Sequence, residues 1–373
     1  MCQNLGHRHS IFCILPPHIL HEIALNGDAQ ERAAAVRTLA ADQTFRAVRA
    51  DLRLSHRPVL AQSMTLGADG EKHRTISTAR QTQSLPGTVV RTEGAPPTND
   101  PAVDEAYDGL GATFDFYWEI FQRNSIDDQG LPLDATVHFG RNYDNAFWNG
   151  QRMVFGDGDG KLFNRFTISV DVIGHELTHG VTQDEAQLAY ANQSGALNES
   201  ISDVFGSLIK QFSLKQTADQ ADWLIGAGLL AKGVNGVALR SMKAPGTAYD
   251  DPVLGKDPQP AHMRDFLHTV EDNGGVHINS GIPNHAFYLA ATNIGGYAWE
   301  KAGRIWYETL RDTHLRTTAG FRAFARLTLA NAGRLYGVGS PEQQAVHDAW
   351  HEVGVAVPAI TTPTKTKTRG QAN

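Results

Sequence analysis

Three residues near the middle of the chain, His175, His179 and Glu199, have the types and spacing of a metal site. Residues four apart on a helix lie on one face, so both imidazoles of the His175-Glu-Leu-Thr-His179 motif can reach one ion. Glu199 follows after 19 intervening residues, which leaves room for a turn and the start of a second helix. Two histidines, one glutamate and an open fourth position form a catalytic zinc arrangement. The pattern therefore predicts one catalytic zinc ion.

Glu176 and Asp203 can support such a site without binding the ion. Glu176 is offset from the two histidines, so it can accept a proton from water at the metal. Asp203 lies four residues after Glu199 on a helix whose opposite face is apolar. It is then placed to accept a hydrogen bond from a zinc-binding histidine. The alternatives are a chance match of the five-residue motif on a solvated helix and, for Asp203, a solvated charge.

A second pair of residues, Asp272 and His277, flanks two glycines that allow the backbone to turn tightly. A carboxylate next to an imidazole favours the protonated ring. Such an imidazolium suits the stabilisation of a developing oxyanion. A histidine in a loop, taken alone, is more often simply exposed.

The runs around these residues resemble those of the thermolysin family of metallopeptidases, in the gluzincin group. The resemblance extends from about Ala102 to Val355. Aminopeptidase relatives in the group usually have the glutamate one residue closer, so the spacing favours the endopeptidase branch. The resemblance rests on five runs: Asn145-Ala-Phe-Trp-Asn-Gly150, Gly156-Asp-Gly-Asp-Gly160, Gly174-His-Glu-Leu-Thr-His-Gly180, Gly195-Ala-Leu-Asn-Glu-Ser-Ile-Ser-Asp203 and Asp272-Asn-Gly-Gly-Val-His-Ile-Asn-Ser-Gly281.

The resemblance implies roles for the site residues. Glu176 is expected to be the general base, His277 with its partner Asp272 and Tyr190 to stabilise the oxyanion, and Asn198 to support the metal site beside Glu199. An extended peptide substrate is expected to bind at Asn145, Ala146 and Trp148, with Arg240 contacting a substrate carbonyl. An apolar pocket would favour a bulky hydrophobic side chain just after the cleaved bond; its expected lining is Phe163, Phe166, Val172, Ile225, Leu229 and Leu239. Each of these residues, taken singly, is as easily explained by packing, and Phe147 is interpreted only in that way.

The implied fold is α+β with two lobes, a β-rich N-terminal lobe and a helical C-terminal lobe, with the zinc helix between them. The expected divisions are a short propeptide (1–55), an exposed linker or start of the mature chain (56–86), the N-terminal lobe with the zinc helix (87–183), the helical lobe (184–357) and a disordered tail (358–373). Apolar periodicity predicts strands at 84–91, 135–139, 145–148 and 151–155. It predicts helices at 29–52, 102–125, 170–182, 196–213, 281–294, 297–313, 318–335 and 341–352.

The N-terminal segment resembles the propeptide of the protealysin-like subgroup, with Asp28 as the expected N-cap of its long helix. Residues up to about 50–60 are expected to lie across the cleft, with Pro16 and Pro17 fixing an extended conformation. His18, Ile19 and Leu20 would then fill the substrate pockets. The alternatives are the Cys13 thiolate bound to zinc and a helical extension of the mature enzyme.

Composition narrows the classes of protein. The chain has 373 residues, of which 41% are hydrophobic and 20% charged, with a net charge of −7. This composition is typical of an ordinary globular protein and implies no general affinity for nucleic acid or anionic membranes. The family resemblance implies a monomer that acts on peptides and proteins. The apolar run 11–15 is too short for a Sec signal, so cytoplasm is the default expectation and non-classical secretion the alternative. The cysteines are Cys2 and Cys13, so the catalytic part has no disulfide.

Two further expectations concern calcium and rival functions. Family members with a double calcium site use an acidic cluster, of which Asp171 and Asp222 remain here. Lys210, Leu224, Ala227 and Gly228 replace the other acidic residues, so the double site is expected to be absent. The rival functions are a peptide-binding protein with structural zinc and a metal-independent serine or cysteine hydrolase. Neither accounts for Glu176 beside an open metal position, and no GxSxG motif is present.

Overall fold

The computed structural model describes residues 12–54 and 70–360. Most of the expected tail (358–373) and the first part of the expected linker (56–69) lie outside these ranges. Among the described residues, none of the helices combines the length and apolar character needed to cross a bilayer.

A mixed six-stranded sheet builds the first lobe, in the order β1-β5-β6-β4-β2-β3. The strands β2, β4 and β6 run parallel, and the other neighbours are antiparallel. The predicted strand 84–91 is shorter and later than expected, because Pro86 has no N–H to donate to the sheet. The strands are β1 (Phe12–Cys13), β2 (Arg74–Thr78), β3 (Thr88–Thr92), β4 (Leu133–Val137), β5 (Ala146–Trp148) and β6 (Met153–Phe155).

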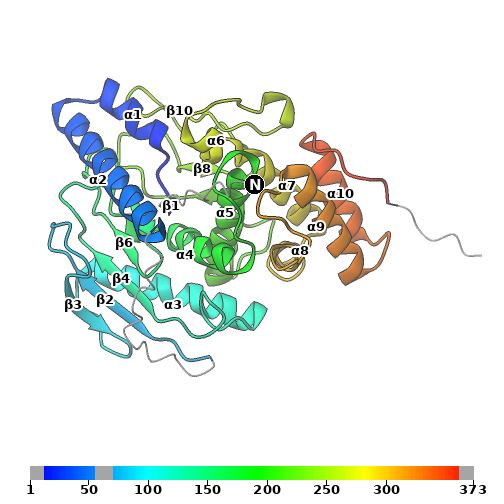
Figure 1. The fold of residues 1–373 in the computed structure, drawn as a ribbon, viewed down its shortest axis with the longest axis horizontal. Helices are drawn as coiled ribbons and strands as arrows, with labels where there is room; N and C mark the ends of the chain where they lie inside the picture. Colours follow the sequence, from blue (N-terminus) through cyan, green and yellow to red (C-terminus); the bar gives the residue numbers. More distant parts are fainter. Residues whose placement is uncertain (1–11, 55–69, 361–373) are drawn as a thin grey trace, which may run out of the picture.

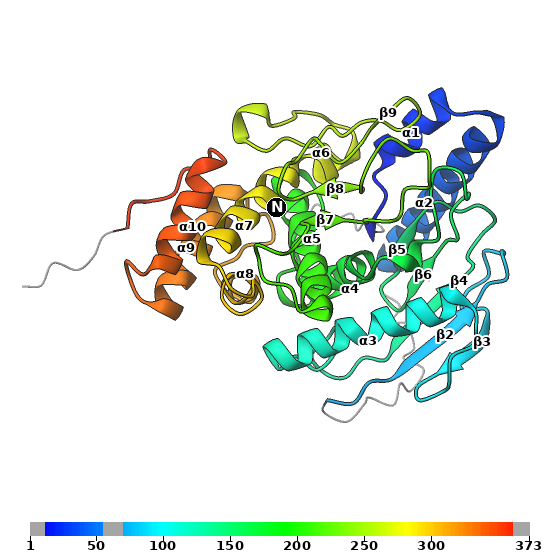
Figure 2. The same cartoon turned by 180° about the vertical axis from the view of Figure 1, so that it is seen from behind.

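The residues 74–78, which the sequence divisions place before the first lobe, are an inner strand of this sheet. Helix α3 (Pro101–Phe121) packs against β2 and β4, as Figure 2 shows. Asp100 caps α3 by accepting a hydrogen bond from the Ala102 N–H (3.1 Å). The sheet, which includes β5, and α3 form two packed layers.

The N-terminal segment adds one strand and two helices, α1 (Pro17–Asn26) and α2 (Ala29–Leu54). Helix α1 lies beside the small sheet of β9 (Asp250–Asp251) and β10 (Gly255–Lys256), and α2 packs against α1 (Figure 1). Asp28 caps α2 as predicted, because its Oδ1 accepts from the N–H groups of Gln30 and Glu31. In return, Glu31 Oε2 accepts a hydrogen bond from the Asp28 N–H, which completes a capping box.

The extended conformation expected for Pro16 and Pro17 is correct for Pro16 and wrong for Pro17, which is the first residue of α1. His18, Ile19 and Leu20 follow it in the same helix. Proline favours the first helical position because its missing N–H has no partner there in any case. The extended stretch lies upstream, where Phe12 and Cys13 pair with β5.

Helices build the second lobe, and Figure 1 shows α7 to α10 in yellow to red at the end away from the sheet. The short elements are β7 (Leu224–Ile225), β8 (Arg240–Ser241), and the 3-10 turns Phe166–Ile168 and Met263–Asp265. The helix predicted at 297–313 is limited to 302–310, because residues 297–300 close a turn instead. The helices are α4 (Val170–Glu185), α5 (Asn192–Leu214), α6 (Asp272–Asn279), α7 (Gly281–Ile294), α8 (Ala302–Leu310), α9 (Phe321–Tyr336) and α10 (Pro341–Glu352).

One contiguous core of buried apolar side chains runs through both lobes. Helices α4 and α5 cross at its centre, where Gly206 approaches the backbone of α4. A Cβ at Gly206 would lie 2.4 Å from the Asp171 carbonyl oxygen, so only glycine allows this approach. The expected α+β architecture, with the predicted zinc helix α4 between a β-rich and a helical lobe, is confirmed.

Candidate active site

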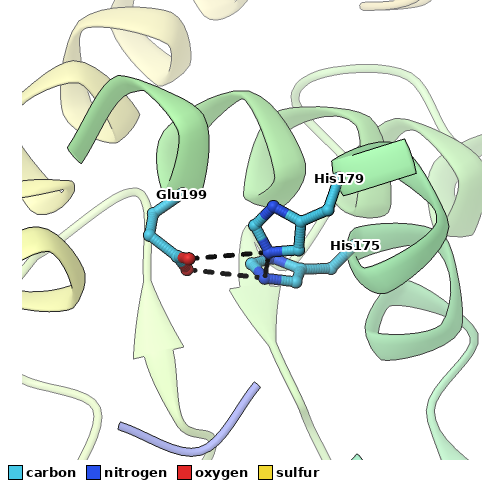
Figure 3. A group of neighbouring side chains, drawn as sticks. All are labelled: His175, His179 and Glu199. Atoms are coloured by element: carbon cyan, nitrogen blue, oxygen red, sulfur yellow. Dashed lines mark hydrogen bonds and ion pairs between the residues drawn. The ribbon is translucent and has the colours of Figure 1, made fainter. Parts of the chain in front are cut away.

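His175, His179 and Glu199 come together where α4 and α5 cross, and all three are buried. Figure 3 shows the two imidazoles projecting from one helix toward the carboxylate of the other. The Nε2 atoms of the histidines are 3.0 Å apart. Each lies 3.5 Å from a different oxygen of Glu199.

A tetrahedral zinc with bonds of about 2.0–2.2 Å holds its ligand atoms roughly 3.3–3.5 Å apart. Both distances from the histidines to Glu199 fit this range, and the 3.0 Å between the two Nε2 atoms is shorter, so the rings would separate slightly around an ion. Glu199 Oε2 is buried and accepts no hydrogen bond within the described part of the chain. A buried carboxylate oxygen without a donor is the expected state of a ligand atom. The three residues therefore suit the predicted metal.

The outer nitrogens of both histidines are held by polar side chains of α5. His175 Nδ1 donates to Asp203 Oδ1 (2.8 Å), as the sequence predicted. His179 Nδ1 lies 2.8 Å from Asn198 Oδ1 and 3.0 Å from Ser202 Oγ. These partners fix the orientation of the rings. Ser202 was missed by the sequence analysis, although it follows Asn198 by four residues on the same helix face.

Glu176 lies beside the metal ligands and is fully buried. Its Oε2 accepts a hydrogen bond from the Trp148 N–H (3.0 Å), while Oε1 has no hydrogen-bond partner among the described residues. Burial raises the pKa of Glu176 well above its usual value, and the negative charge of Glu199 raises it further. The arrangement suits a proton acceptor.

Asp272, His277 and Tyr190 form a second cluster next to Glu199. The residues Asn273, Gly274 and Gly275 have left-handed backbone angles, so the chain turns back and brings Asp272 Oδ1 within 2.7 Å of His277 Nδ1. Burial opposes protonation of His277, but Asp272 and Glu199 outweigh it and raise its pKa. His277 Nε2 lies 3.1 Å from the Tyr190 hydroxyl, which also donates to Glu199.

Arg240 is joined to the metal site through Asp203. Its Nε and one terminal nitrogen donate to the two oxygens of Asp203, each at 2.8 Å. Burial opposes ionisation of Asp203, but Arg240 and His175 lower its pKa to about 2. The remaining terminal nitrogen of Arg240 donates to the Ile14 carbonyl oxygen (3.0 Å).

The N-terminal segment lies against these residues as a short antiparallel strand on β5. The Ile14 N–H donates to the Ala146 carbonyl oxygen (3.2 Å), and the Leu15 N–H to Asn145 Oδ1 (3.0 Å). The Cys13 carbonyl oxygen is 3.2 Å from His277 Nε2. Backbone groups of residues 13–15 therefore contact both the predicted oxyanion residue and the predicted substrate strand.

The Cys13 side chain does not support the alternative of a thiolate on zinc. It packs in a cluster with Tyr143, Phe147 and Val154, and the group of potential metal ligands in the described residues is His175, His179 and Glu199 alone. The carbonyl of a strand residue lies near the plane of the sheet and its side chain stands roughly perpendicular to that plane, so the Cys13 carbonyl meets His277 while its side chain lies in this cluster. Phe147 is a packing residue there, as interpreted from the sequence.

The six residues of the predicted apolar pocket are all buried. Phe163, Phe166, Val172, Ile225, Leu229 and Leu239 belong to the same contiguous core as Ile14. They come from two stretches of the chain, 163–172 and 225–239, which are joined where the Asn164 N–H donates to the Leu229 carbonyl oxygen (2.8 Å).

Lys210 lies between the two acidic residues that remain at the positions of the double calcium site, Asp171 and Asp222. Its ammonium lies 3.2 Å from Asp171 Oδ2 and 2.8 Å from Asp222 Oδ2. It also donates to the Leu224 carbonyl oxygen (3.2 Å). A fixed positive charge thus lies between the two remaining acidic residues.

Comparisons with known proteins agree with this geometry. Residues 61–183 match the model of the thermolysin metallopeptidase catalytic domain, and residues 186–355 that of the thermolysin metallopeptidase alpha-helical domain. An extracellular metalloprotease of Pectobacterium carotovorum is 57% identical over 93% of this chain and 97% of its own length. An extracellular minor metalloprotease of Serratia marcescens is 47% identical over 77% of this chain and 79% of its own. The solved precursor of protealysin, a metalloproteinase from Serratia proteamaculans, has 57% identity and a TM-score of 0.85, with 92% of this chain and all of that chain covered.

The comparisons correct one expectation. Cytoplasm was the default because residues 11–15 are too short for a Sec signal. That expectation is wrong, since relatives that cover most of the chain are named as extracellular. The extent of identity, the matched domains and the metal cluster place this chain in the thermolysin family of zinc metallopeptidases.

Proposed function

We propose that the protein is a secreted, monomeric zinc endopeptidase that cleaves peptide bonds before bulky hydrophobic residues and is made as an inactive precursor. The observation that carries the proposal is the group of three metal-binding side chains with the Glu176 carboxylate beside it. Secretion is supported by the names of the relatives.

His175, His179 and Glu199 would hold the zinc. When bound, the ion supplies a Lewis acid and lowers the pKa of water toward 7. Glu176 accepts the proton of the attacking water at its free Oε1 and passes it to the leaving amine. His277 Nε2 and the Tyr190 hydroxyl donate to the oxygen of the scissile carbonyl, while Asp272 keeps the His277 ring protonated and oriented.

The substrate binds as an extra strand on β5. Asn145 and Ala146 pair with its backbone, as they do with residues 14–15 of this chain. The bonds from Ile14 N–H to the Ala146 carbonyl oxygen and from Leu15 N–H to Asn145 Oδ1 fix the position of the N-terminal segment along β5. Because the Cys13 carbonyl faces His277 and the Ile14 carbonyl faces Arg240, Ile14 stands where the residue after the cleaved bond would bind.

This register supports the proposed specificity. Ile14 is fully buried in the core that contains the six predicted pocket residues. An apolar side chain of this size gains about 1.5–3 kcal/mol from burial, whereas a charged one would lose its hydration. Leucine, isoleucine and phenylalanine are the residues that we expect after the cleaved bond.

The same contacts support an inhibitory role for the N-terminal segment. Residues 13–15 use the donors and acceptors that a substrate needs, so both cannot bind together. The solved protealysin structure that this chain resembles is also described as a precursor. In place of the double calcium site, we propose that Lys210 supplies the positive charge between Asp171 and Asp222.

A casein digestion assay tests the function. Processed protein should cleave casein, lose activity with a zinc chelator and regain it with zinc, and the new N-termini should be bulky hydrophobic residues. The unprocessed chain should be much slower.

His277→Ala should lower kcat by roughly 100–1000-fold while zinc stays bound. Chelator-insensitive cleavage, or equal rates for unprocessed and processed chains, would contradict the proposal.

A further inference from the structure

Asp203 is a common acceptor for residues that the proposed function assigns to two different tasks. Its Oδ1 accepts from His175 Nδ1 and from Arg240, both at 2.8 Å. Its Oδ2 accepts from Arg240 Nε and from Asn284 Nδ2, again both at 2.8 Å. One buried carboxylate therefore orients a metal ligand and the guanidinium that holds a peptide carbonyl.

Asn284 differs from the other donors to Asp203 because it has no assigned role at the metal or at the substrate. It lies in the first turn of α7, the helix that follows the His277 segment. The residue is 1% exposed, and its Oδ1 has no hydrogen-bond partner among the described residues. Burying an amide oxygen without a donor is unfavourable. Packing alone would be served better by an apolar residue, so the contact with Asp203 is the feature that explains an asparagine here.

We propose that Asn284 is a positioning residue, which holds Asp203 so that His175 and Arg240 keep their relative placement. The proposal rests on the roles assigned above to these two residues. Without the Asn284 amide, Oδ2 keeps a single donor, and the Asp203 carboxylate can rotate about its bond to Cβ. Rotation moves the donors at both oxygens, so the metal site and the substrate site are affected together.

The substitution Asn284→Leu tests this role because it keeps the size of the side chain and removes the donor. We expect the zinc Kd to rise about tenfold, the lower end of the effect of losing a partner behind a metal ligand. Arg240 holds the substrate in the ground state and the transition state alike, so KM should rise several-fold with kcat at saturating zinc nearly unchanged. Zinc affinity is measured by chelator competition in an inactive Glu176→Ala background, which prevents self-digestion.

Asn331→Leu is the matched control, since Asn331 is also buried and donates to Thr309 and Asp312 on the far side of the helical lobe. It should lower the Tm but leave the zinc Kd and KM unchanged. The same pattern in Asn284→Leu would overturn the proposal. If Asn284→Leu does not fold, Asn284→Ser takes its place in the test, because the serine hydroxyl is too short to reach Asp203. The same rise in zinc Kd and KM is expected for it.

Arg240→Ala separates this inference from the proposed function. An unchanged KM in Arg240→Ala would contradict the role of Arg240 in substrate binding, and the zinc Kd would then decide the inference about Asn284. A raised KM in Arg240→Ala with unchanged zinc Kd and KM in Asn284→Leu would contradict the inference alone.

Discussion

At the level of single residues, the Glu176 carboxylate is oriented by a backbone N–H of the strand β5. One of its oxygens is held by the N–H of Trp148, the last residue of the strand on which a substrate would pair. The other oxygen has no hydrogen bond in the described structure and is thereby left for water. The strand proposed to bind the peptide therefore also holds the proposed proton acceptor in place.

Tyr190 donates to the metal ligand Glu199, but its main role is expected to be in the reaction rather than in holding the metal. Tyr190→Phe should lower kcat by roughly 100-fold, since one donor to the oxyanion is lost. The zinc content, measured by metal analysis, should stay at one ion per chain. Tyr117→Phe is the control, because it removes a buried hydroxyl that bonds Thr178. Its kcat should not change, and a normal kcat in Tyr190→Phe as well would exclude Tyr190 from the mechanism.

Helical spacing explains which site residues could be predicted from the sequence. His175 and His179 are neighbours on one helix, and the Asp203 contact follows from the register set by Glu199. Ser202 was equally within reach of that reasoning. Asn284 was not, because α7 meets α5 only through the packing of the whole helical lobe, which no local pattern encodes.

At the scale of secondary-structure elements, the crossing of α4 and α5 depends on charge as well as on close packing. Lys210 on α5 lies beside Asp171 in the first turn of α4, and Asp171 is 1% exposed. Burial raises the pKa of Asp171, and Lys210 opposes that effect. The ammonium thus joins the two helices and the loop of Asp222.

Lys210→Met should therefore destabilise the fold by roughly 3 kcal/mol, near the low end for breaking a buried ion pair, because Asp222 reaches solvent. The free energy of unfolding in urea measures the effect, and the exposed Lys243→Met serves as the control. A calcium-selective chelator should leave the Tm of the unsubstituted protein unchanged. A clear fall in Tm with that chelator would contradict the replacement of calcium by Lys210.

The starts of the two N-terminal helices, α1 and α2, differ in how well the sequence predicts them. Asp28 and Glu31 supply a local capping signal, so the start of α2 was predicted correctly. Pro16 is extended as expected, whereas Pro17 begins α1, because a proline is favoured both in extended chain and at the first position of a helix. The sequence at the two prolines does not distinguish these cases.

At the scale of the whole molecule, α2 covers a buried acidic residue of the catalytic part. Thr38 on α2 accepts a hydrogen bond from the Asp144 N–H (3.1 Å), and Asp42 accepts from the side chains of Tyr143 and Asn145. Neither oxygen of Asp144 has a hydrogen-bond partner among the described residues. Burial, and next the nearby Asp159, raise the pKa of Asp144 well above its usual value.

This raised pKa predicts a pH-dependent stability of the unprocessed chain. A carboxyl group whose pKa is higher in the folded state favours folding below its unfolded pKa, near 3.8, and that contribution is lost as the pH rises toward the folded pKa. Asp144→Asn stays neutral, so it should be more stable than the parent, and the difference should grow from pH 5 to pH 8. Urea unfolding in the Glu176→Ala background measures it. A constant difference, or the same trend in the exposed Asp108→Asn, would refute the prediction.

The added strand β1 also bears on solubility once the precursor is processed. While β1 is present, β5 has a partner on both sides. When it leaves, the outer N–H and C=O groups of Ala146–Trp148 form an open sheet edge, and such edges can recruit other chains into aggregates. A charge or proline at this edge would prevent that but would also block peptide binding. The three-residue length of β5 limits the hazard, so the protein can keep an open edge for its substrates at little risk of aggregation.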